Sequence, residues 1–504
     1  MTCAQLGDNC GGVSDGCSAV LSCGTCSAPD TCGGTGAPNF CGTSAGPCVG
    51  LCQDLTTCSN GGTTSISGTV YAPNGTDPLP NVLVYVPNSA VEPFTPGVAC
   101  ELAGETASGS PLVSTTTRAD GTFTLKNMPV RAEIPLVIQA GRWRRQLVIS
   151  NVSSCQNTAL PATFAIMPSS QAEGDIPKIA IVTGAVDATE CALRKIGIAD
   201  SEFTDPPALG GTGRINLYLG DSLANSTTGS GPGAQISGNT PSETELEGTQ
   251  AAMNQYDLLI YSCQGTEISP TANQLQTLLN YVNAGGRVYA THYAYGWLDN
   301  AATFQGTADW DLNQGEQDNG TGLINQTFPE GLELAQWLQS TGATTTLGQI
   351  PLDTLREDFN GVVAPSELWI TLTPGGGSFP MQYTFNTPVG VSAANQCRRV
   401  QFNDYHVEDT TSSPTTGVTF PDECVSGPTT AQEKLLEYNL FDLTNFLAPD
   451  VPPAIAVGFV NGPATFKQND ESDTAQSTSR TPARKLPPAT HSPRLSLFRP
   501  ALRH

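Results

Sequence analysis

The cysteines of this chain are distributed very unevenly, and no other feature constrains the fold as strongly. Ten of the 16 cysteines lie between Cys3 and Cys58, in a segment rich in Gly, Ser and Thr with few aliphatic residues. Such a segment cannot bury a core, so disulfides are expected to hold it, and disulfides persist in oxidising compartments. Zinc is the competing interpretation, because Cys23 and Cys26 have metal-binding spacing, but no histidine or second close pair lies nearby. We expect a disulfide-rich module over residues 1–60 and an extracellular or cell-envelope location.

The overall charge and hydropathy of the chain restrict its partners. The formal net charge of -24 argues against a nucleic-acid partner, because phosphate backbones require a basic surface. No apolar run approaches the roughly 20 residues that span a bilayer, so no transmembrane segment is predicted. The chain begins at Met1 inside the cysteine-rich module without a signal peptide, so export is inferred from the cysteines. The remaining candidate partners are a glycan or a component of the cell envelope.

Residues 64–168 show the two-residue period of β-strands. "SISGTVYAP", "NVLVYVPNS" and "GTFTLKNMP" alternate apolar and polar residues and are bounded by Pro, Gly and Asn. This pattern resembles carboxypeptidase-regulatory-like (transthyretin-like) domains, and the resemblance implies a β-sandwich without catalytic residues. The module before it resembles the cysteine-rich repeats at the front of bacterial secreted modular proteins. Within 88–115, an expected insertion, Cys100 is a candidate disulfide partner for Cys155.

From residue 175 strands alternate with helices. "KIAIVTG", "YDLLIYSC" and "RVYATH" are apolar strands, and a helix is predicted from Ser269-Pro270 until Gly285-Gly286. Later elements are predicted as a helix at 329–340, strands at 381–387 and 398–403, and a last helix with a capping box of Thr430 and Glu433. The alternation predicts an open, mostly parallel, flavodoxin-like α/β sheet over 175–450. The polar, proline-rich and basic residues 451–504 are predicted to be a disordered tail.

Functional groups of an open α/β sheet collect beyond the carboxyl ends of its strands. Distinctive residues follow three of the predicted strands, and an aromatic group follows the third. The candidate ligand-binding residues are Thr183, Gly184, Gln264, Tyr293, Tyr295 and Trp297.

One stretch carries a second family resemblance. "YDLLIYSCQGTEISPTANQLQTLLNYVNAGGRVYATHYAYGWL" resembles the ThuA-like branch of the class I glutamine-amidotransferase-like fold. The resemblance places His292 at the elbow where amidotransferases carry a nucleophilic Cys, and His406 in "FNDYHVED" resembles their late histidine. Because the elbow lacks Cys, amidotransferase chemistry is excluded. ThuA-like proteins are linked to sugar metabolism, so the resemblance implies a carbohydrate ligand.

The two histidines allow three interpretations. They are candidate catalytic residues for acid–base chemistry, with Asp404 or Glu408 setting the imidazole tautomer. Two histidines and a carboxylate also suit a metal ion. The interpretation that we favour from sequence is a buried, hydrogen-bonded His292 packed on Tyr295 and Trp297, so no metal or cofactor is predicted.

Cysteines and charged segments nearby lead to further predictions. Cys263 invites a nucleophile interpretation, but in an oxidising compartment a disulfide between Cys191 and Cys263 is favoured. Cys397 and Cys424 bracket the His406 segment and are expected to pin it. The acidic residues within 309–320 are predicted to form a solvated loop rather than a calcium site, because Gly and the closing Glu are misplaced for an EF-hand. The basic residues from Arg142 to Arg145 are expected to form an inter-domain contact.

Two functions therefore remain open. The leading hypothesis is a non-catalytic extracellular or envelope binding protein for a glycan, and the alternative is a ThuA-like sugar-active enzyme that uses His292 and His406. An enzyme requires both histidines and a carboxylate within reach of one open pocket.

Overall fold

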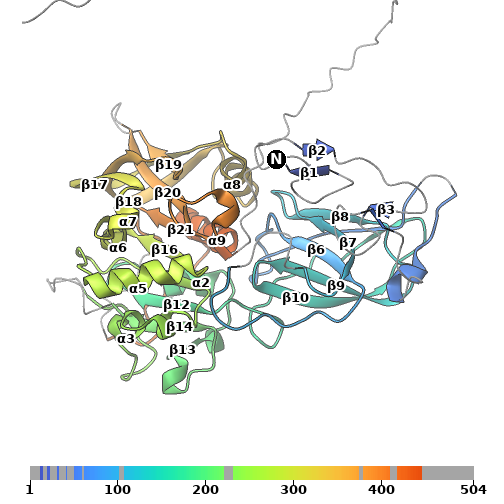
Figure 1. Cartoon of the computed structure of the whole chain (residues 1–504), viewed down its shortest axis with the longest axis horizontal. Helices are drawn as coiled ribbons and strands as arrows, with labels where there is room; N and C mark the ends of the chain where they lie inside the picture. The colour runs from blue at the N-terminus through green and yellow to red at the C-terminus, as the bar shows by residue number, and fades with distance from the viewer. Residues whose placement is uncertain are drawn as a thin grey trace, which may run out of the picture. The chain divides into compact units, whose positions relative to one another are not determined.

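The computed structural model describes residues 50–59, 62–100, 107–220, 231–373, 378–408 and 417–444, together with four short strands nearer the N-terminus (Figure 1). Most of the predicted cysteine-rich module and the whole predicted tail lie outside the described residues. The short strands pair as β1 (Gly12–Ser14) with β2 (Val20–Ser22) and β3 (Thr31–Cys32) with β4 (Cys41–Gly42).

Two sheets form between residues 65 and 159, where the sequence alternates with a period of two. A four-stranded sheet has the order β10-β9-β6-β7, and a three-stranded sheet has the order β11-β5-β8. The inward side chains, such as Val84, Leu136 and Phe123, are buried in one apolar cluster. Assignment of these sheets to the carboxypeptidase-regulatory-like family stays a prediction. The strands are β5 (Ser65–Thr69), β6 (Leu83–Pro87), β7 (Pro111–Thr116), β8 (Thr122–Lys126), β9 (Ala132–Ala140), β10 (Trp143–Asn151) and β11 (Asn157–Ala159).

The third large sheet has ten strands in the order β13-β14-β12-β15-β16-β21-β20-β19-β17-β18 (Figure 1). From β13 to β21 neighbouring strands are parallel, and from β21 to β18 they are antiparallel. The predicted mostly parallel sheet is thus correct for one half only. Its strands are β12 (Ile179–Thr183), β13 (Phe203–Thr204), β14 (Ile215–Leu219), β15 (Leu258–Tyr261), β16 (Arg287–Thr291), β17 (Ala308–Ile324), β18 (Gln349–Val362), β19 (Glu367–Leu372), β20 (Phe379–Thr387) and β21 (Arg398–Asn403).

In the antiparallel half, the strands predicted at 381–387 and 398–403 are confirmed as β20 and β21, but β17, β18 and β19 were missed, and the longest of them is acidic. The prediction of a solvated loop over 309–320 is wrong, since this segment lies within β17 and pairs with β18. Its acidic side chains are exposed and alternate with Trp310 and Leu312, which pack on the core. That alternation is a strand signal, and the abundance of Asp and Glu concealed it. A register shift between Trp310 and Gly315 bends the strand.

Helices cover both faces of the parallel strands. Ile181 and Ile260 point toward α2 and α9, whereas Val182 and Tyr261 point toward α5. The helix predicted at 329–340 is confirmed as α8, and the capping box of Thr430 and Glu433 is confirmed at α9. Helix α5 begins later than predicted, because Thr271 and Gln274 form its capping box. The helices are α2 (Thr189–Lys195), α3 (Glu243–Glu247), α4 (Gln250–Met253), α5 (Ala272–Asn283), α6 (Gly296–Asp299), α7 (Ala302–Gln305), α8 (Pro329–Ser340) and α9 (Ala431–Thr444).

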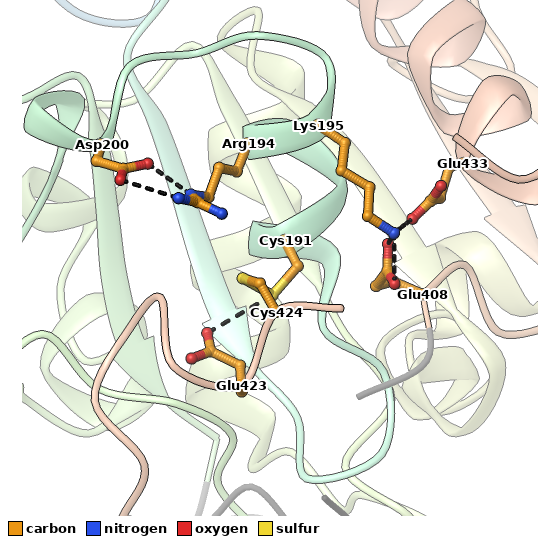
Figure 2. Close-up of a disulfide and its surroundings, with 8 residues drawn as sticks. All are labelled: Cys191, Arg194, Lys195, Asp200, Glu408, Glu423, Cys424 and Glu433. Atoms are coloured by element: carbon orange, nitrogen blue, oxygen red, sulfur yellow. Dashed lines mark hydrogen bonds and ion pairs between the residues drawn. A yellow bond between two sulfur atoms is a disulfide. The ribbon is translucent and has the colours of Figure 1, made fainter. Parts of the chain in front are cut away.

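Three disulfides join the described residues, and both predicted pairings are wrong. The bonds are Cys58–Cys155, Cys100–Cys397 and Cys191–Cys424. Cys191 lies on α2, where it reaches the segment that precedes α9 (Figure 2). Cys263 is a buried free thiol that follows β15.

Of the basic residues from Arg142 to Arg145, Arg142 contacts the residue that leads into β15, and the expectation of an inter-domain contact stays a prediction. Arg142 Nη1 lies 2.9 Å from Asp257 Oδ1, and both side chains are buried. Trp143 packs on Phe441 of α9 with ring centroids 5.2 Å apart. Of the described residues, no helix has both the length and the apolar character needed to span a bilayer.

Candidate active site

The parallel strands bring the candidate residues to one edge of the sheet. Strands β15 and β16 are neighbours, as are β16 and β21, and all three run in the same direction. Their carboxyl ends therefore lie side by side. Cys263 follows β15, His292 follows β16 and His406 follows β21. Residues far apart in the sequence meet at this edge.

His292 occupies a sharp strand-to-helix elbow. Strand β16 ends at Thr291, and the 3₁₀ helix η4 (His292–Tyr295) begins at once. His292 has φ of 53°, a left-handed conformation that is costly for a residue with a side chain. The turn aims the imidazole at the space beyond the sheet, and the side chain is only 6% exposed. The elbow expected from the family resemblance is thus present in the backbone.

The two histidines and the free cysteine form one cluster. Cys263 Sγ lies 3.1 Å from His292 Nδ1, and the His292 and His406 ring centroids are 4.4 Å apart. One ligand atom from each of the three side chains lies within 4.8 Å of the others. The cluster lines a cleft of about 680 Å³, large enough for a small molecule.

Strands β17 and β18 supply the polar side of this cleft. The lining includes Glu316, Gln317 and Asp318 from β17, and Thr354 and Leu355 from β18. These acidic residues belong to the segment predicted as a solvated loop. As parts of a strand, they face the histidine cluster across the cleft.

Arg356 is a charged residue of the site that the sequence did not single out. Its guanidinium is buried and lies over the Tyr293 ring, 4.1 Å from the centroid. It donates to Tyr293 Oη at 2.8 Å, to Glu316 Oε1 at 2.6 Å and to Asp358 Oδ2 at 2.8 Å. An arginine within an acidic strand has many explanations, and only the folded sheet shows that it faces the histidines.

Burial keeps Cys263 and His292 uncharged. Burial, with the nearby His406 and Arg356, lowers the pKa of His292 well below its usual value. Burial likewise raises the pKa of the Cys263 thiol to about 12. At neutral pH the pair is therefore a thiol beside a neutral imidazole, not a thiolate–imidazolium pair. This state disfavours an activated cysteine nucleophile.

Asp404 and Glu408, the predicted carboxylate partners, are engaged elsewhere. Asp404 Oδ2 accepts the backbone N–H of Asp358 at 2.8 Å, which attaches β18 to the end of β21. Burial and Asp358 raise the pKa of Asp404 well above its usual value. Glu408 pairs with Lys195 at 2.9 Å, and the same lysine contacts Glu433 (Figure 2). These contacts position the segment that carries His406.

Only one of the predicted aromatic ligand-binding residues lines the cleft. Tyr293 lies there, with its ring edge-on to His292. Tyr295 and Trp297 are fully buried, and Trp297 packs on Tyr261 with ring centroids 4.8 Å apart. Their placement favours a role in packing.

The other predicted ligand-binding residues fasten the strand ends together. Thr183 Oγ1 donates to the carbonyl oxygen of Ala234 at 3.1 Å, and Gln264 Nε2 donates to Glu243 Oε2 at 3.1 Å. A Cβ at Gly184 would lie 1.9 Å from the Cys263 carbonyl oxygen, so only glycine fits there. Thr183 therefore attaches the end of β12 to residue 234, whereas Gly184 and Gln264 lie at the Cys263 turn.

Comparisons with known proteins give partial likenesses. No family model matches the chain, and no curated protein matches it. A ThuA-like protein from Bacteroides uniformis has a similar structure, with 13% identity and a TM-score of 0.28 over 53% of this chain and 91% of that one. A ThuA-like protein from Parabacteroides merdae matches with 11% identity and a TM-score of 0.26 over 51% of this chain and 98% of that one. These scores are too low to carry an argument about function.

Proposed function

We propose that this protein is an exported enzyme that acts on a small, polar, sugar-like molecule in the cleft beside Cys263, His292 and His406. The observation that carries the proposal is the meeting of both histidines and a free thiol on one cleft. A binding protein for glycans needs neither a strained elbow nor an imidazole pair. The same cleft would serve the alternative, an envelope protein that only binds a glycan.

The chemistry of the cleft supports an enzyme. His406 is partly exposed and able to exchange protons with a bound molecule. Glu316 and Asp318 add carboxylates on the opposite wall, and Arg356 fixes the position of Glu316. These groups suit a substrate with several hydroxyls, because carboxylates and imidazoles accept and donate hydrogen bonds.

Two further considerations set the compartment and the substrate class. The disulfides of the described residues, together with the cysteine-rich N-terminal sequence, support an oxidising location outside the cytoplasm. The sugar class rests on the resemblance of residues 256–298 to ThuA-like sequences.

A substrate screen with matched variants tests the proposal. The disulfide-intact protein is assayed on chromogenic glycosides and sugar esters, beside His406→Gln, His292→Asn and the control Gln276→Asn, at an exposed residue of α5 outside the cleft. We expect turnover of at least one substrate and a loss of about 100-fold or more in both cleft variants, the scale of lost acid–base catalysis. The control should keep its activity, and circular dichroism should show that all variants are folded.

The opposite result is also clear. Binding of an oligosaccharide without turnover of any compound, measured by calorimetry and blocked by the cleft variants, would favour the binding protein. Equal turnover in the parent and both cleft variants would remove the histidines from the mechanism.

A further inference from the structure

We propose that Cys263, His292 and His406 form a zinc-binding site. Their ligand atoms lie within 4.8 Å of one another, and Cys263 Sγ lies 3.1 Å from His292 Nδ1. Tetrahedral zinc, with Zn–S of about 2.3 Å and Zn–N of about 2.0 Å, places its ligand atoms about 3.3–3.6 Å apart. Small side-chain rotations bring the three atoms to that spacing.

The ligand types select the ion. One thiol and two imidazoles suit zinc, whereas calcium and magnesium require oxygen ligands. Copper also accepts two histidines and a cysteine, as in blue-copper sites, so copper is the ion that the test must distinguish from zinc.

The backbone beside two of the three ligands is held by hydrogen bonds. Gly265 N–H donates to Cys263 Sγ over 3.4 Å. The His406 backbone N–H donates to the Thr354 carbonyl at 3.2 Å, and the His406 carbonyl accepts from Gln432 Nε2 at 2.5 Å. These contacts fix the main chain that carries the Cys263 and His406 side chains.

The site is of the open type. Structural zinc has four protein ligands, whereas catalytic zinc has three and keeps one position for water. Here three side chains lie at the wall of a cleft of about 680 Å³, which leaves the fourth position facing that space. Glu316 and Asp318 on the opposite wall favour the approach of a cation.

The zinc site deepens the proposed function and rests on the same cleft. Zinc would supply activation of water, which suits hydrolysis of a sugar derivative. Metal binding is measured without any substrate, so the two proposals fail separately. Turnover by the metal-free protein would leave the enzyme standing and remove zinc from its mechanism, whereas stoichiometric zinc without turnover would leave the zinc site standing and remove the enzyme.

The test uses the full chain with its disulfides intact. Protein dialysed against a chelator is titrated with Zn²⁺ in the presence of a competing indicator dye, and metal content is measured by mass spectrometry. We expect one zinc per chain, and a loss of affinity greater than about 100-fold in Cys263→Ser and His406→Gln, beyond the 10–100-fold typical of outer contacts. Asp318→Asn lines the same cleft without being a ligand and should lose less than about 10-fold.

Cobalt provides a readout that folding alone does not give. Co²⁺ bound to the parent should show an intense thiolate-to-metal charge-transfer band, which Cys263→Ser should lose while it keeps the parent circular dichroism. Unchanged zinc affinity in both ligand variants would overturn the site. Preferential retention of copper with an intense visible band would overturn zinc as its ion.

Discussion

Removal of the Cys191–Cys424 disulfide should destabilise the protein strongly. The bond joins α2 to the segment before α9, and its cysteines are 233 residues apart (Figure 2). In the double variant Cys191→Ala/Cys424→Ala the unfolded chain gains freedom that the bond denies it. Alanine leaves no reactive thiol behind.

The size of the loss in unfolding free energy follows from the length of the chain loop that the Cys191–Cys424 disulfide closes. In the unfolded chain the Cys100–Cys397 bond shortens that loop to roughly 120 residues, for which chain entropy gives about 5 kcal/mol. Cys58–Cys155, with a separation of 97, gives nearly the same value and serves as the matched control. We expect both double variants to lose about 3–5 kcal/mol, since measured losses fall somewhat below the entropy estimate.

Two buried carboxyls beside the bond modify this value with pH. Burial raises the pKa of Glu423 to about 7 and raises that of Glu190 well above its usual value. A carboxyl with a raised folded-state pKa stabilises the fold while protonated and loses that contribution as the pH rises through its folded pKa. If the variant lets water reach Glu423, the measured loss should be smaller near pH 8 than near pH 5.

The assay is guanidinium unfolding followed by tryptophan fluorescence. The proteins are compared on condition that the free energy of unfolding falls with guanidinium concentration at the same slope in each. A loss below about 1 kcal/mol for Cys191→Ala/Cys424→Ala, beside a full loss for the Cys58–Cys155 variant, would refute the reasoning. It would mean that the segment before α9 is held by its other contacts.

Three further predictions concern single residues. Lys195→Met leaves the buried Glu408 and Glu433 without their shared cation. The free energy of unfolding, measured by calorimetry, should fall by about 3–5 kcal/mol. An unchanged value would show that the carboxyls are neutral. Gly184→Ala should lower the free energy of unfolding by about 1–3 kcal/mol, because the added methyl would collide with the Cys263 carbonyl oxygen 1.9 Å away. An unchanged midpoint of chemical unfolding would contradict that contact. Burial raises the pKa of Glu333 to about 7. The free energy of unfolding of the parent should therefore fall by at most about 2 kcal/mol as the pH rises from about 4.5 to about 7. In Glu333→Gln the measured free energy of unfolding should depend less on pH.

Hydrophobic period and capping residues predicted the helices and strand ends that depend on only a few neighbouring residues. The helix at 329–340 and the capping box of Thr430 were readable because period and caps act over a few residues. The strand ends that carry His292 and His406 were readable for the same reason. Parallel neighbours then place these ends side by side, and the sequence alone could not show which strands are neighbours.

Pairings over long separations were not readable. Cysteine connectivity depends on which surfaces face one another after folding, so Cys191 met Cys424 and left Cys263 free. Arg356 was overlooked because its role depends on the antiparallel half of the sheet, which an acidic strand had concealed.

The Cys100–Cys397 bond has a consequence for proteolysis of the chain. It connects a residue between β6 and β7 to one just before β21, at a sequence separation of 297. A protease that cuts once anywhere inside that interval leaves two pieces in one covalent molecule. Damage of this kind would pass unnoticed on a non-reducing gel, and only a reductant would separate the fragments.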